Sequence, residues 1–255
     1  MFLNFWRMSS PTNTTSRPVF LNAAWRRLLL LNYRIQPEAL LPWLPAHTEL
    51  DLWNDTCYVS LVGFMFQNTR LRGFHIPGHV NFEEINLRFY VRRNDPELGW
   101  KRGVVFVREI VPRPAIAWVA NTLYRERYVT RRMGHRWQEN PNLLEVEYSW
   151  QEAGQTQSFG VRADPQPVEL KAGSEAEFIT EHYWGYSFRD ARSSTEYQVE
   201  HPRWRVHPIR EWSCHVDFGA VYGAGFACLT ETQPLSVFLA EGSDVVVRGG
   251  KRILR

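Results

Sequence analysis

The sequence predicts a mainly β protein with a few short helices, built around antiparallel strands that close, or nearly close, into a barrel. The clearest observation comes from residues 56–111, which contain three apolar or alternating segments separated by linkers rich in turn residues. The second observation is that segments with a helical pattern are few and short. A closed arrangement is expected because it leaves no strand edge exposed to other chains.

Strands are expected in both halves of the chain, and several neighbouring pairs are separated by turns. One hairpin has Asp95-Pro96 and two glycines in its linker, and another turns at Glu152-Ala153-Gly154. The segment 234–250 is expected to form two strands joined at Glu241-Gly242-Ser243. The predicted strand segments are WRRLLLLNYRI (25–35), TCYVSLVGFMF (56–66), NFEEINLRFYV (81–91), RGVVFVREIV (102–111), NLLEVEYSW (142–150), TQSFGVRA (156–163), EYQVEH (196–201), WRVHPIREW (204–212) and PLSVFLAEGSDVVVRGG (234–250).

Three helices are expected between these strands. Pro37 opens a short one that ends before Pro45, since a proline at the first helical position loses no hydrogen bond. Pro114 opens the second, in which apolar residues recur at helical spacing. Ser174 and Glu177 have the spacing of a capping box and therefore predict a third helix start.

The chain of 255 residues is long enough to bury a substantial core, and no linker in its middle indicates a second domain. We therefore expect a single β-barrel domain over 19–250. It follows a flexible N-terminal arm over 1–18, whose later residues are small and polar, and precedes a C-terminal tail over 251–255.

Composition gives little support for a charged macromolecular partner. The formal net charge is only +3, although arginines outnumber lysines by 27 to 3, a bias that codon preference explains in large part. The three cysteines (Cys57, Cys214 and Cys228) are too few for a disulfide framework, and the run LLLL is too short to cross a bilayer. We expect a cytoplasmic protein without a membrane segment.

The strand expected at 81–91 has two unlike faces. Side chains alternate along a strand, so an aliphatic face begins at Ile85 while Glu84, Asn86 and Arg88 share the other face. That polar face either meets water, as in many antiparallel strands, or lines a cavity. If it is enclosed, Glu84 needs a partner, and Arg88 is the candidate.

Five of these segments together resemble the YqjF-like family, uncharacterised bacterial proteins grouped as a domain of unknown function. They are FLNAAWRRLLLLNYRI, VSLVGFMFQNTRLRG, NFEEINLRFYVRR, RGVVFVREIVPR and EFITEHYWGY. That family is in turn distantly similar to the acetoacetate decarboxylase fold, a β-barrel that holds substrate inside. The resemblance implies an acetoacetate decarboxylase-like fold with an enclosed site and, because Phe82-Glu83-Glu84 falls on the Tyr-Asn-Glu strand motif of that enzyme, implies that Glu84 is the site glutamate.

The same resemblance implies a lysine pair where Tyr128 and Val129 stand in this chain. An imine-forming lysine needs a dry or cationic setting that lowers its pKa. Lys101, Lys171 and Lys251 all fall in turns, loops or the tail, where we expect them to face solvent. Decarboxylation through an imine is therefore not expected.

Further candidates come from neighbouring segments. Arg108 and Glu109 face opposite ways on one strand, and we favour Arg108 as the residue that enters the cavity. Tyr124 and Tyr128 could donate to a developing oxyanion, or could simply satisfy buried polar groups. His182, expected on a helix, could act as a base or be structural.

No pattern in the sequence predicts a bound metal or another cofactor. His75 and His79 are four residues apart, but Pro77-Gly78 between them rules out the helical pair geometry of a zinc site. Arginine and tryptophan are frequent enough to keep single-stranded nucleic acid as a minor alternative partner. The expected partner is a small molecule, and the sequence is silent on oligomeric state.

Two hypotheses of different classes follow. The first is an enclosed site that binds a small organic acid or carbonyl compound, with lyase-like or hydratase-like acid–base chemistry by Glu84. In that case Asn86, Arg88, Arg108, Tyr124, Tyr128 and His182 would contact the substrate. The second is a non-catalytic ligand-binding or sensing domain that keeps the fold without the chemistry.

Overall fold

The computed structural model describes residues 17–254 and contains two β-sheets. The larger sheet has eleven strands: β1 (Val19–Arg34), β2 (Glu49–Leu50), β3 (Tyr58–Leu71), β4 (Phe82–Asp95), β5 (Gly99–Val111), β6 (Tyr128–Thr130), β10 (Trp184–Asp190), β11 (Ser193–Glu200), β12 (Val206–His207), β14 (Ser236–Arg248) and β15 (Lys251–Ile253). The smaller has four, in the order β13-β9-β8-β7: β7 (Met133–Asn140), β8 (Leu143–Glu152), β9 (Gln155–Ala163) and β13 (Ile209–His215).

The larger sheet closes into a ring. Its neighbours follow the order β14-β1-β3-β4-β5-β10-β11, and β11 pairs again with β14 through Val199 and Val247. The ring is mixed, because β5 runs parallel to both β10 and β6. The expectation of an antiparallel sheet was wrong here for a physical reason: β7, β8 and β9 of the smaller sheet lie between β5 and β10 in the chain, and this long excursion returns the chain in its original direction.

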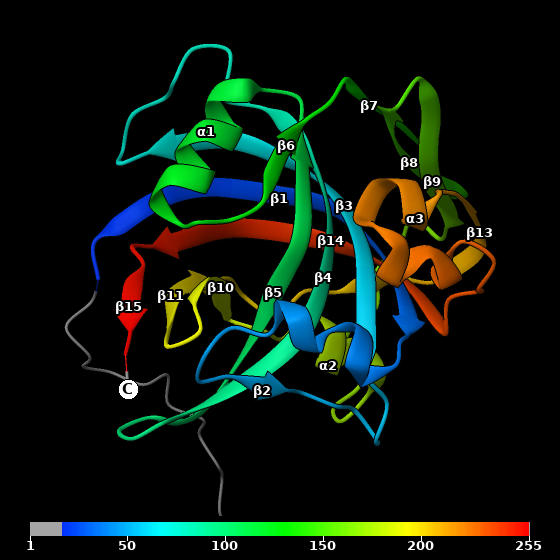
Figure 1. Ribbon diagram of the computed structural model, residues 1–255. Helices are drawn as coiled ribbons and strands as arrows, with labels where there is room; N and C mark the ends of the chain where they lie inside the picture. Colours follow the sequence, from blue (N-terminus) through cyan, green and yellow to red (C-terminus); the bar gives the residue numbers. More distant parts are fainter. Residues whose placement is uncertain (1–16, 255) are drawn as a thin grey trace, which may run out of the picture.

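The smaller sheet packs against the outside of the ring (Figure 1). The aliphatic face of β4, including Ile85 and Leu87, is fully buried in one core together with Val146 and Tyr148 of β8 and Phe159 of β9. Helix α3 (Phe218–Tyr222) and the 3-10 helix η3 (Ala224–Leu229) complete this core. A sheet, in addition to helices, therefore covers the aliphatic face, and the opposite face of β4 points into the ring.

The short helices begin where the sequence predicts. Helix α1 (Pro114–Leu123) starts at its proline, and α2 (Glu175–Thr180) starts where Ser174 accepts a hydrogen bond from the Glu177 amide at 3.2 Å. The segment after Pro37 forms two 3-10 turns, η1 (Pro37–Ala39) and η2 (Leu41–Trp43). Helix α2 ends sooner than expected, so His182 lies just beyond it and not on a helix.

Segment 234–250 forms one long strand, β14, and not the expected pair of strands. It pairs with β1 on both sides of Gly242, which lies opposite Arg26 and adopts a φ of +80°. On β1 the neighbouring Arg27 also has a positive φ, at +55°. The glycine therefore supplies a local irregularity within a continuous ladder, which sequence patterns cannot distinguish from a turn.

The ends of the domain are tied to one buried carboxylate. Arg17 donates to Glu196 Oε1 at 2.7 Å, and β15, in the segment expected to be a tail, pairs with β11 next to the same residue. Most of the arm expected over 1–18 lies outside the described residues. Within the described part, the chain is thus fixed to the ring from Arg17 onward.

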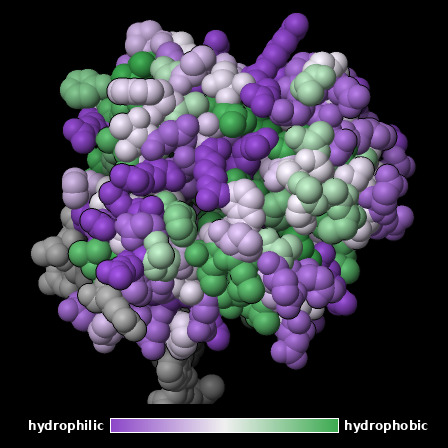
Figure 2. Space-filling view, in the orientation of Figure 1, coloured by the Kyte–Doolittle hydropathy of each residue, from purple (hydrophilic) through white to green (hydrophobic). Residues whose placement is uncertain are grey.

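Polar side chains cover most of the face seen in Figure 2, and apolar ones form small groups between them. Along residues 17–254 no helix has both the length and the apolar character needed to span a bilayer.

Candidate functional site

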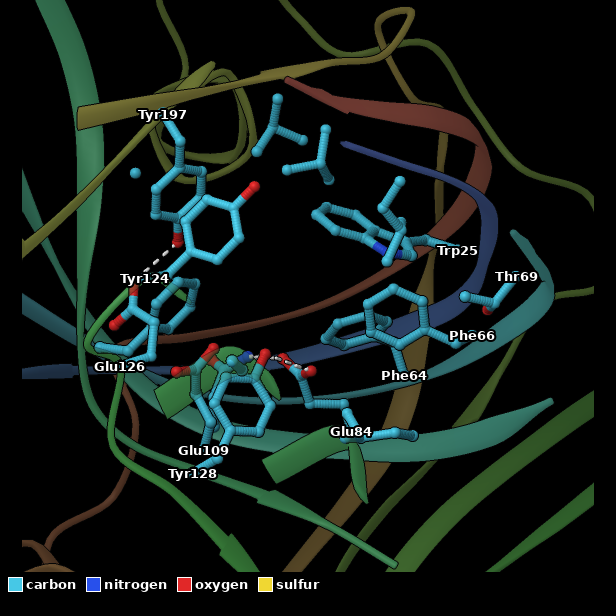
Figure 3. Close-up of a pocket in the computed structure, with 18 of the residues that line it drawn as sticks. Trp25, Phe64, Phe66, Thr69, Glu84, Glu109, Tyr124, Glu126, Tyr128 and Tyr197 are labelled. Atoms are coloured by element: carbon cyan, nitrogen blue, oxygen red, sulfur yellow. Dashed lines mark hydrogen bonds between the residues drawn. The ribbon is translucent and has the colours of Figure 1, made fainter. Parts of the chain in front are cut away.

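The interior of the ring holds a cavity of about 220 Å³. It lies between the ring strands and α1, with apolar side chains over most of its wall and acidic groups gathered in one region (Figure 3). Apolar walls with a few convergent polar groups are typical of small-molecule sites. The polar face of β4 supplies Glu84, Asn86 and Arg88 to this cavity.

Glu84 is a buried carboxyl group with two hydrogen-bond donors. Asn86 Nδ2 donates to Oε1 at 3.1 Å, and the Tyr128 hydroxyl donates to Oε2 at 2.9 Å. Burial disfavours the charged form and raises the pKa of Glu84 to about 7, although the two donors oppose that rise. Near neutral pH this group is close to half ionised, so it can accept or release a proton.

Glu109, and not Arg108, is the residue of β5 that enters the cavity. Glu109 pairs with Asn86 across the sheet and therefore shares its face, whereas Arg108 pairs with Leu87 and donates to the carbonyl of Val221 in α3. Our preference for Arg108 was wrong because the β4–β5 register, which decides the face, is not visible in the sequence. Burial raises the pKa of Glu109 well above its usual value, and its Oε2 has no hydrogen-bond partner among the described residues.

A third buried carboxyl comes from the segment after α1. Arg125 has a φ of +56°, and in the strand that follows Tyr128 lies beside Glu109. Glu126 lines the cavity there and accepts a hydrogen bond from the Tyr197 hydroxyl at 3.0 Å. Burial raises the pKa of Glu126 to about 8. Tyr124 and Tyr128, both sequence candidates, line the same region.

These three groups, Glu84, Glu109 and Glu126, are called the carboxyl cluster below. Their negative charges oppose one another: Glu126 and Glu84 both raise the pKa of Glu109, and Glu84 raises that of Glu126. No member forms an ion pair within residues 17–254. Arg127 is adjacent in sequence, but its guanidinium stacks over Trp43 at 4.2 Å, and Trp43 packs in the core outside the ring.

Arg88 lines the cavity but is not the partner of Glu84 that we expected. One of its amino groups donates to the Ile179 carbonyl at 3.1 Å, while its buried Nε has no partner in the described chain. Glu84, Asn86 and Arg88 alternate along one face of β4, so the Glu84 and Arg88 backbones are about 13 Å apart. Asn86 lies between Glu84 and Arg88 on this face, and their side chains do not form an ion pair.

His182 also faces the cavity and is buried. Its Nε2 lies 3.5 Å from Asp51 Oδ2, which is longer than a good hydrogen bond, and neither ring nitrogen has a hydrogen-bond partner among the described residues. Burial lowers the pKa of His182 to about 4, so the imidazole is neutral at physiological pH.

No lysine lines the cavity within the described residues. Lys101 is buried and not exposed as expected, because a β-hairpin places its ammonium 2.9 Å from Asp95 and 3.3 Å from Glu196. The same ammonium lies 4.1 Å from the ring centre of Trp184. Both ion pairs hold this ammonium away from the cavity, so Lys101 is not placed to form an imine with a molecule bound there.

The wall across from the acidic region is aromatic. Trp25 of β1 packs against Phe64 and Phe66 of β3, with ring centres 5.1 and 5.8 Å apart (Figure 3). Sequence reasoning missed these residues, and it also left Tyr197 unassigned. The alternation that places Trp25, Phe64 and Phe66 on one face of their strands was visible in the sequence. The closure of the sheet into a ring, which decides which face is enclosed, was not.

The family model DUF2071, which describes an uncharacterized conserved protein, matches residues 22–244. The chain belongs to the DUF2071 family. A curated relative of this DUF2071 chain is the uncharacterized protein YqjF of Bacillus subtilis (strain 168), with 35% identity over 68 residues. That match spans 26% of the chain and only 28% of the length of the relative.

Solved structures show the fold of the DUF2071 chain to be acetoacetate decarboxylase-like. Acetoacetate decarboxylase from Legionella pneumophila has a TM-score of 0.62 at 12% identity, covering 97% of this chain and 93% of its own. The enduracididine biosynthesis enzyme MppR, complexed with the condensation product of pyruvate and imidazole 4-carboxaldehyde, has a TM-score of 0.64 at 13% identity, covering 93% and 90%. MppR has also been solved with pyruvate and with HEPES bound.

Proposed function

We propose that this DUF2071 protein binds a small carbonyl compound or organic acid in the ring cavity, and that Glu84 exchanges a proton with the bound molecule. The observation that carries the proposal is a buried carboxyl whose pKa lies near 7 in a largely apolar cavity. Structural neighbours that bind pyruvate or act on acetoacetate lend support to this ligand class.

Polar side chains on β4 and β5 offer donors for the carboxylate and the carbonyl of a bound acid. The unpartnered Nε–H of Arg88 can donate to a carboxylate oxygen, and Arg88 is a charged donor. The carboxyl cluster lies further along the same strand, where a carbonyl oxygen would accept a hydrogen bond from protonated Glu109. The aromatic wall of Trp25, Phe64 and Phe66 would contact an apolar substituent.

Proton transfer then needs no imine. Ionised Glu84 removes a proton from the carbon next to the carbonyl, and the C–H bonding pair moves to form an enolate. Its oxygen is stabilised by the hydrogen bond from protonated Glu109. Return of a proton from Glu84 restores the substrate, and departure of a β-substituent from the enolate gives a lyase-like or hydratase-like outcome. Burial and the two neighbouring carboxyl groups raise the pKa of Glu109, which favours its protonated form.

Deuterium exchange tests this proposal directly. Benzylpyruvate in D₂O is expected to lose its α-proton signal in NMR faster with the protein than without it. Glu84→Gln is expected to slow the protein-dependent rate at least about 100-fold, because the amide cannot act as a base. Binding should persist, seen as a ligand-dependent rise in melting temperature.

Glu83→Gln is the matched control. Glu83 is adjacent to Glu84 but points to the opposite side of β4, where it pairs with His135 at 2.7 Å. This variant should retain exchange at the wild-type rate. Equal exchange rates in wild type and Glu84→Gln would contradict the role of Glu84.

A non-catalytic ligand-binding domain is the second candidate, and the absence of a lysine from the cavity wall favours it. It predicts that benzylpyruvate raises the melting temperature of the wild-type protein without accelerating exchange.

A further inference from the structure

The carboxyl cluster concentrates potential negative charge without a counter-ion. Three carboxyl groups meet in one wall of the cavity, and none has an ion-pair partner in the described chain. The other polar neighbours in this wall are an amide and phenols: Asn86 and Tyr128 donate to Glu84, and Tyr197 donates to Glu126. Tyr124 lies beside them. Ionised carboxyls in such a place cost free energy unless a cation arrives.

The protein itself keeps its nearby cations away. Arg108 leaves β5 on the opposite face, and the Arg127 guanidinium stacks over Trp43 outside the ring. Arg88 is also in the cavity wall, but its side chain is bound to the carbonyl of Ile179. Among the described residues the cluster therefore has no ion-pair partner, although the charge of Arg127 reaches Glu126 and partly offsets the rise of its pKa.

An open acceptor marks where a donor would bind. Glu109 is only 2% exposed and lines the cavity, and its buried Oε2 has no hydrogen-bond partner in residues 17–254. Buried polar atoms are nearly always paired in folded proteins. An ammonium group offers three donors and a positive charge, which matches an unpaired acceptor set among three carboxyl groups.

We propose that the natural ligand carries a protonated amine, which is held by Glu109 together with Glu126. This rests on the proposed binding function of the same cavity and narrows its ligand to small amino compounds with an apolar part. The carboxylates give direct ion pairs to the ammonium, Glu84 remains beside the reacting carbon, and the aromatic wall receives the apolar part. Binding the cation favours the ionised carboxylates, so protons held by the cluster are released on binding. With an amino compound, Glu109 is therefore ionised, and an N–H of the bound ammonium replaces its proton as the donor to the carbonyl oxygen.

Benzylamine and benzyl alcohol are suitable probes because they have nearly the same size and differ in charge. Calorimetric titration at about pH 7 is expected to show benzylamine binding at least about tenfold more tightly. Repeating the titration in two buffers of different ionisation heat counts protons, and release of about one proton per amine is expected. Benzyl alcohol should release none.

Variants test whether the carboxyl cluster causes the preference for the amine. Glu109→Gln is expected to lower benzylamine affinity at least about tenfold and to leave benzyl alcohol affinity unchanged, because the amide keeps the shape without the charge. Glu126→Gln should also lower benzylamine affinity. It replaces Glu109→Gln in this test if that variant does not fold. The control Glu83→Gln, on the opposite face of β4, should retain the full amine preference.

Equal affinities for the two probes, no proton release, or an unchanged amine preference in both cluster variants would overturn the amine assignment. If benzylpyruvate binds and exchanges while benzylamine does not bind, the amine assignment alone fails. If none of the three probes binds, the proposed function fails with it.

Discussion

Stability is expected to fall by roughly 3 to 6 kcal/mol as the pH rises from about 6.5 to about 9, because the folded protein holds protons that the unfolded chain has already released. Burial raises the pKa of Glu84 to about 7 and that of Glu126 to about 8, and raises that of Glu109 as well. The usual glutamate value is 4.5, so across this window unfolding releases protons and a higher pH favours it.

The window avoids the opposing contribution of buried histidines. Burial lowers the pKa of His182 and His201 to about 4, so these groups stabilise the fold above their ordinary value of 6.5 and lose that contribution only below it. At pH 6.5 the unfolded imidazoles are about half protonated, so their opposing effect is small and ends by about pH 7.5, and the carboxyl cluster dominates the slope. Urea unfolding at a series of pH values measures it.

Variants test whether the carboxyl cluster causes this dependence of stability on pH. Glu126→Gln should remove about 2 kcal/mol of the loss and should be more stable than wild type at about pH 9, because an amide carries no buried charge there. Glu83→Gln, whose side chain lies on the far side of β4, should follow the wild-type slope. A wild-type stability that stays flat across the window would contradict a buried, proton-holding cluster.

Gly242→Ala is expected to destabilise the protein by about 3 to 5 kcal/mol. An added Cβ would lie 2.1 Å from the carbonyl oxygen of Trp25 and 2.8 Å from Leu28, and the φ of +80° is strained for alanine. Backbone cannot move as a side-chain tip can, so β14 and β1 would have to separate at this point. Because Trp25 lines the cavity, ligand-dependent stabilisation should fall as well.

Gly154→Ala separates the clash from the φ strain. Gly154 has a φ of +82° in the β8–β9 turn, and an added Cβ there would meet no atom within 4 Å. Its expected cost is about 1 kcal/mol. Equal losses in the two variants, measured by denaturant unfolding, would contradict the tight β1–β14 contact.

Local patterns predicted the elements well. Alternation along β4, the proline at the start of α1 and the Ser174 cap all depend on neighbours in sequence, and the structure has each of them. The mixed sheet was not predictable in this way, because the parallel β5–β10 pair joins segments separated in the chain by β7, β8 and β9. Strand β10 itself was missed, since its residues adjoin a helix signal.

Alternation along single strands also predicted part of the site. Glu84, Asn86, Arg88, Tyr124, Tyr128 and His182 all line the cavity. The choice between Arg108 and Glu109 depended on the register of β4 and β5, and Lys101 was misplaced because its carboxylate partners are distant in sequence or across a turn. Strand register and ring closure, which join distant segments, decided most of these misses.

The most direct test of a buried, proton-holding carboxyl cluster is an NMR titration of glutamate side chains labelled with ¹³C at the carboxyl carbon. The structure predicts glutamate signals that titrate near or above neutral pH, and that disappear one at a time in Glu84→Gln, Glu109→Gln and Glu126→Gln. Titration of every glutamate in the ordinary range, near 4.5, would contradict it.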